Sequence, residues 1–113
     1  SVQLCLEVFL ASKPEYAESI RSGLAARDPH ALQIVGHTLA GSFVGILRPH
    51  LLKHARALED EATERTRSGG PLDDTLTLAH RLLSVLDGIE QEVRAHLEAG
   101  GAIAAAAEAR QVT

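Results

Sequence analysis

Six histidines carry most of the chemistry that this sequence could perform, since there is one cysteine and no glycine-rich loop that could cradle a nucleotide phosphate. His50 and His54 stand four residues apart, a spacing that places two imidazoles on one face of a helix, within reach of one metal ion. No adjacent glutamate, no third ligand at a matching spacing and no nearby cysteine accompany them. We therefore interpret them as solvated histidines and expect no metal site.

His37 differs from the others because its place in the predicted helix turns it away from the core. Each helical residue advances about 100° around the axis. With Leu39 taken as the inward direction, four apolar residues fall within about 40° of it: Leu32, Val35, Phe43 and Ile46. His37 lies about 200° from Leu39 and is expected to face solvent. The same outer face is predicted for His30, Gln33, Ile34, Gly41 and Val44.

Gly41 is an unusual neighbour for an exposed histidine. A glycine within a helix costs about 1 kcal/mol relative to alanine, and here it would remove bulk beside the imidazole. Such a gap could admit a partner or a phosphoryl group. The alternative is an ordinary exposed histidine with scattered surface aliphatic side chains around it.

Composition excludes several classes of function. The chain has 113 residues, a formal net charge of −4 and 3% aromatic residues, which argues against nucleic-acid binding. No apolar run reaches the roughly 20 residues of a membrane span, and no secretory signal is recognisable. Because Cys5 cannot form an internal disulfide, we expect a cytoplasmic protein without direct membrane contact. The absence of methionine favours a domain cut from a longer protein over a processed start.

The elements that position these residues are predicted to be helices, because apolar residues recur every three or four positions and β-branched residues are sparse. A capping box of Ser12 and Glu15, an Asp28-Pro29 start and a Gly100-Gly101 stop supply boundaries. The expected helices span residues 4–11, 12–26, 29–46, 49–67 and 72–98.

Connections of a few residues favour an all-α fold, an antiparallel up-down four-helix bundle with a short additional N-terminal helix. The bundle is expected over residues 1–101. Residues 102–113 form an Ala-rich tail that continues as a loose helix or frays.

The stretch Gly36-His37-Thr38-Leu39-Ala40-Gly41-Ser42, with Leu51 and Leu58-Glu59 after it, resembles the histidine phosphotransfer (HPt) domain of bacterial multistep phosphorelays. The resemblance extends from about Val8 to Leu97. It implies that His37 accepts a phosphoryl group on Nε2 from a receiver-domain aspartate and passes it to another receiver aspartate.

An exposed imidazole is in part unprotonated at cytosolic pH and can act as the nucleophile. The resemblance implies a phosphorelay intermediate rather than a stand-alone enzyme, a module of a hybrid sensor histidine kinase whose parent is either cytoplasmic or membrane-anchored. The receiver partner would supply Mg²⁺, and this chain would bind no cofactor. A monomer is sufficient for the transfer that the resemblance implies.

The resemblance also assigns roles to neighbours. Gly41 leaves room for the phosphoryl group, with Ser42 as the small hydroxyl residue beside it. The apolar ring that meets the receiver includes Ile34 and Val44, and the docking face also includes Gln33 and His30. Glu59 would hold the second imidazole nitrogen, or else pair with an arginine, since it lies at the flank of the buried stripe of its helix.

Two positions depart from the family pattern. Ala40 stands where the family has a lysine near the phosphate, and Leu47 stands where a later glycine is expected. Arg48 or Lys53 could replace the missing charge, but no spacing argument places either near His37. The loss of the lysine keeps open a second hypothesis, a helical docking domain that binds a receiver or another regulatory protein without accepting phosphate.

Overall fold

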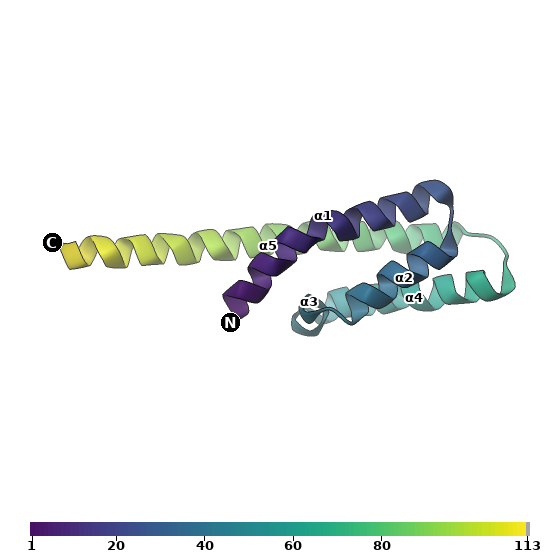
Figure 1. The fold of residues 1–113 in the computed structure, drawn as a ribbon, viewed down its shortest axis with the longest axis horizontal. Helices are drawn as coiled ribbons and strands as arrows, with labels where there is room; N and C mark the ends of the chain where they lie inside the picture. Colours follow the sequence, from purple (N-terminus) through teal and green to yellow (C-terminus); the bar gives the residue numbers. More distant parts are fainter. Residues whose placement is uncertain (113) are drawn as a thin grey trace.

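The chain is mostly helical in the part that its computed structural model describes, residues 1–112 (Figure 1). The helices are α1 (Val2–Ala26), α2 (Pro29–Ala40), α3 (Phe43–Leu47), α4 (Pro49–Ser68) and α5 (Asp73–Val112). The all-α prediction is confirmed.

The expected short N-terminal helix is wrong, because α1 runs without interruption through Pro14. It starts at Ser1, whose hydroxyl accepts a hydrogen bond from the Leu4 amide, and ends at Arg27 in the left-handed conformation. A continuous helix places both halves of the segment on the same core, with these buried residues: Leu6, Phe9, Ala17 and Ile20. This shared burial outweighs the local preference of Ser12 and Glu15 for a helix start.

The single helix expected over residues 29–46 is broken at Gly41, so α2 ends at Ala40. The Ser42 hydroxyl donates to the Leu39 carbonyl at 2.7 Å and accepts from the Gly45 amide at 3.1 Å, which starts the separate helix α3. Because of this break, the side chains after it point in other directions than a continuous helix would give them.

Three residues therefore face the opposite way from the prediction. Phe43 and Ile46, expected in the core, are 51% and 70% exposed. Val44, expected on the outer face as part of the docking ring, is buried at 6% exposure. The predicted directions of these side chains are wrong because they assumed one continuous helix across the turn at Gly41.

The expected end of the last helix at Gly100-Gly101 is also wrong, since α5 continues to Val112. Neither glycine adopts the positive φ of a helix-ending cap. Earlier in α5, Leu82 is fully buried, and Leu83 packs at the edge of the core.

Each of the four longer helices packs against two of the other three. Helix α2 packs on α4, α4 packs on α5, and α1 packs on both α2 and α5 (Figure 1). The largest fully buried side chains come from all four: Ile20, Leu32, Leu39, Leu51, Leu58, Leu82, Leu86, Ile89 and Val93. Figure 1 shows the C-terminal part of α5 projecting beyond the other helices.

Ion pairs join the helices at the edge of this core. Lys13 of α1 contacts Asp87 at 2.5 Å and Glu90 at 3.0 Å, both on α5. Arg48, which precedes α4, contacts Glu92 of α5 at 3.1 Å. Among residues 1–112, no helix combines the length and apolar character needed to cross a bilayer.

Candidate functional site

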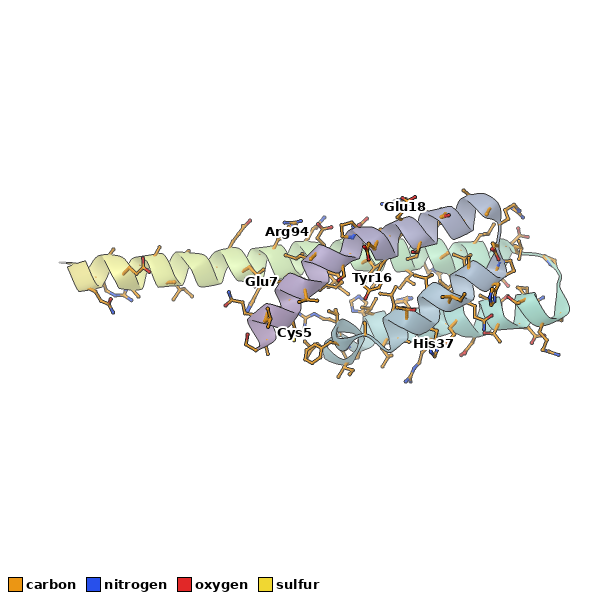
Figure 2. All side chains as sticks on the ribbon, viewed as in Figure 1. Cys5, Glu7, Tyr16, Glu18, His37 and Arg94 are labelled. Atoms are coloured by element: carbon orange, nitrogen blue, oxygen red, sulfur yellow. The ribbon has the colours of Figure 1, made fainter. Side chains whose placement is uncertain are left out.

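His37 lies on the outer side of α2, and 78% of its side chain is exposed (Figure 2). Helix α2 is fixed at its start by the Asp28 carboxylate, which accepts hydrogen bonds from the His30 and Ala31 amides. Its inner face is anchored by buried side chains: Leu32, Val35 and Leu39. An anchored helix presents the imidazole to solvent from a rigid base.

Glu59 of α4 holds one nitrogen of this imidazole. The Glu59 Oε2 atom lies 2.6 Å from His37 Nδ1. A carboxylate can only accept a hydrogen bond, so the hydrogen belongs to Nδ1. In the neutral ring this tautomer leaves a lone pair on Nε2. Of the two roles considered for Glu59, the histidine contact is the one formed, and no arginine pairs with it among residues 1–112.

Gly36 explains how a residue of α4 reaches an outward-facing histidine. A Cβ atom at position 36 would lie 2.9 Å from the Ala55 carbonyl oxygen and 3.0 Å from the Glu59 amide nitrogen. The backbones of α2 and α4 therefore touch at the level of His37. The sequence analysis named Gly36 only as part of the motif, and a glycine within a predicted helix was the available signal for a close helix contact.

Gly41 and Ser42 lie in the turn after α2. Gly41 caps α2 rather than lying within a helix as expected, with φ −87° and ψ 0°. A Cβ there would meet only the His37 and Thr38 carbonyl oxygens, at 3.7 and 3.9 Å, so Gly41 borders open space. The Ser42 hydroxyl is engaged in the turn, through the Leu39 carbonyl and the Gly45 amide. Ala40 is partly buried and brings no charge.

The predicted docking residues are divided between surface and core. Ile34 is 52% exposed, His30 is exposed and Gln33 is half-buried, all on α2, whereas Val44 is in the core. A groove of about 590 Å³ between α1 and α2 borders this face, with Ile34 and Thr38 among its lining residues. A second apolar surface, which the sequence analysis missed, is formed at α3 by Phe43 and Ile46.

The other histidines do not build a site. The rings of His50 and His54 meet edge to face with centroids 6.2 Å apart. Partial burial, followed by the charge of His50, lowers the pKa of His54, which disfavours a second cation beside it. No group of three metal-ligating side chains gathers within residues 1–112.

The comparisons with protein-family models, with curated proteins and with solved structures found no match for this chain.

Proposed function

We propose that this chain is a histidine phosphotransfer module of a phosphorelay, with His37 as the phosphoacceptor. One observation carries the proposal: an imidazole that is 78% exposed on an anchored helix has Nδ1 held by Glu59 at 2.6 Å. An exposed histidine without a function needs no such partner. The contact fixes the ring orientation and the tautomer that a nucleophilic Nε2 requires.

The transfer step needs little from this chain beyond position. The Nε2 lone pair attacks the phosphorus of a receiver aspartyl phosphate, and an N–P bond forms. The P–O bond to the aspartate breaks, and the carboxylate leaves with its electron pair. The receiver contributes Mg²⁺, which neutralises charge on the phosphoryl oxygens. In the return direction a second receiver's aspartate attacks the phosphorus, and Nε2 is the leaving group.

The architecture supports this function as part of the same proposal. The pairwise packing of α1, α2, α4 and α5 supports an antiparallel four-helix bundle, with the exposed His37 on an open face. A receiver would approach over exposed residues of α2, with Ile34 as the apolar contact and with Gln33 and His30 beside it. A cytoplasmic, monomeric module within a sensor histidine kinase satisfies these requirements.

A second candidate function is docking without phosphorylation. It is favoured by the exposed apolar side chains Phe43 and Ile46 near the end of α2, and by the uncharged Ala40. Both candidates bind a regulator, so binding does not separate them, whereas covalent labelling does.

The test is incubation with purified phosphorylated receiver domains. We expect the chain to acquire phosphate that is labile in acid and stable in alkali, and we expect His37→Gln to abolish the label. His80→Gln, at another exposed histidine, is the matched control and should label normally. Circular dichroism checks that both variants keep the helical fold. Label that persists in His37→Gln would place the acceptor elsewhere, and an unlabelled wild type with a stable complex would favour docking alone.

A further inference from the structure

A phosphoryl group on His37 creates an electrostatic problem at this site. The group carries about two negative charges near neutral pH, and the Glu59 carboxylate already lies 2.6 Å from the other nitrogen of the same ring. Neighbouring like charges repel unless a cation lies between or beside them. The phosphorylated ring, which keeps its hydrogen on Nδ1, carries one positive charge that offsets only part of this negative charge, and the site as described so far contains no other cation.

The two cations considered from the sequence do not solve this problem. Arg48 is paired with Glu92 of α5 at 3.1 Å. Lys53 precedes Glu59 by six residues, which places it about 120° around α4 from that side chain.

Arg56 is better placed. It precedes Glu59 by three residues, so the two side chains are neighbours on one face of α4. The position of Arg56 along α4 is also favourable. Helix α2 ends where α3 leads into the start of α4, so a step from Glu59 back to Arg56 runs toward the Gly41 end of α2 (Figure 1). The open space beside Gly41 lies at that end.

Arg56 is also available. Its side chain is exposed, and within residues 1–112 it forms no hydrogen bond or ion pair. The other two arginines of α4 are engaged, Arg65 with Glu61 and Arg67 with Glu64. The contact between Gly36 and the α4 backbone keeps the two helices close enough for a long side chain to span them.

We propose that Arg56 binds the phosphoryl group on His37, donating two N–H groups to its oxygens. The planar guanidinium matches two phosphoryl oxygens and stays charged at any physiological pH. This inference rests on the proposed function, because it requires phosphorylation of His37. It makes Arg56 part of the phosphoryl site on the side of the ring opposite the Glu59 contact.

Phosphoramidate tests the inference without a receiver. Nε2 attacks its phosphorus, the N–P bond of the donor breaks, and ammonia leaves with the electron pair and a proton taken up from water. We expect Arg56→Gln to slow labelling of His37 about tenfold, as followed by intact mass and ³¹P NMR. Lys53→Gln, which removes the same charge from the same helix, should label at the wild-type rate.

Two further measurements separate binding of the phosphoryl group from a structural effect. A bound guanidinium favours the dianionic phosphoryl group, so its ³¹P titration midpoint should rise in Arg56→Gln and stay unchanged in Lys53→Gln. A lysine at position 40, one helical turn after His37, should restore the rate when added as Ala40→Lys to Arg56→Gln.

The outcomes distinguish the two proposals. If wild type labels at His37 but Arg56→Gln matches Lys53→Gln in rate and titration, the Arg56 inference is overturned and the proposed function stands. A larger loss in Lys53→Gln than in Arg56→Gln overturns it as well. If His37 of the wild type is labelled neither by phosphoramidate nor by phosphorylated receivers, the proposed function itself fails.

Discussion

At the scale of single residues, the ability of His37 to act as a nucleophile depends on which of its imidazole nitrogens carries the hydrogen. His37 is open to solvent, and water alone would leave its two neutral tautomers in competition. Glu59 removes that competition by accepting from Nδ1. Half-burial of Glu59 shields its carboxylate, since its side chain is 24% exposed against 78% for His37. A shielded acceptor strengthens the hydrogen bond relative to one in water.

Removing this contact should slow the chemistry without unfolding the protein. We expect Glu59→Ala to lower the initial rate of His37 labelling about tenfold, since a charge-assisted hydrogen bond contributes about 1.5 kcal/mol to placing the nucleophile. Nitrogen NMR of the imidazole should show a mixture of tautomers in place of one. Asp60→Ala, an exposed acidic neighbour, is the control. Equal rates and an unchanged tautomer in Glu59→Ala would contradict the assignment.

Residue-level prediction from the sequence succeeded where the helix was regular and failed where it broke. The outward direction of His37 follows from 100° steps within the anchored part of α2. Val44 and Phe43 lie beyond the turn at Gly41, so the same steps gave them the wrong faces. Gly36 signalled a close helix contact, but its partner Ala55 could not be deduced, because the partner depends on how two helices separated in sequence pack.

At the scale of elements, the α2–α4 contact determines whether the site exists. The two helices are in close contact at Gly36, where any side chain would press on the α4 backbone. Backbone cannot move aside as a flexible side chain can.

We expect Gly36→Ala to lower the free energy of unfolding by about 1–3 kcal/mol, because the methyl group forces the two helices apart. The same shift should lengthen the contact between His37 and Glu59, and labelling should slow. Gly88→Ala provides the control, since a Cβ at position 88 meets open space, and it should match or exceed wild-type stability. Denaturant unfolding measures the stability of both variants. An unchanged midpoint for Gly36→Ala would show that the helices can separate there at no cost.

The link between α1 and α5 makes stability depend on pH. Hydrogen bonding to Asp87 raises the pKa of Lys13, whereas the hydrogen bond from Lys13 lowers the pKa of Glu90. The Glu90 contribution is present above its ordinary pKa of 4.5 and is lost as pH falls through its lowered value. The Lys13 contribution is present below its ordinary pKa of 10.5 and is lost as pH rises through its raised value.

Lys13→Met should therefore cost about 1 kcal/mol at pH 7, and the cost should shrink toward pH 3 as Glu90 protonates. Methionine keeps the apolar stem of the side chain in contact. Lys53→Met, at an exposed lysine, should cost less than this at both pH values. Thermal unfolding at pH 3 and pH 7 gives the comparison. If the difference in stability between wild type and Lys13→Met is the same at both pH values, the ion pair is not the source of that difference.

At the scale of the whole molecule, the helices lie around one core and α5 extends past them (Figure 1). The sequence predicted this all-α core because its apolar spacing is regular over most of the chain. It did not predict the extension, since two adjacent glycines usually end a helix and here do not. The backbone energies at Gly100 and Gly101 are small enough for flanking alanines to offset.

A chain shortened after Glu98 tests how far the core reaches. Leu97 is the last side chain of α5 that packs against the core, and Ile103 beyond it is 69% exposed. We expect the shortened chain to keep its free energy of unfolding within about 0.5 kcal/mol of the full chain and to label at His37 at the wild-type rate. A clear loss of stability would show that the core depends on residues beyond 98.

The extension of α5 also illustrates how a helix without tertiary contacts can persist. Starting a helix in water is costly, because several backbone angles must be fixed before the first hydrogen bond forms, whereas lengthening an existing helix costs little per residue. The packed turns before Leu97 supply that starting point, so the alanine-rich turns after it need only elongate. Their helical order depends on the core, so these turns should unfold when the core melts.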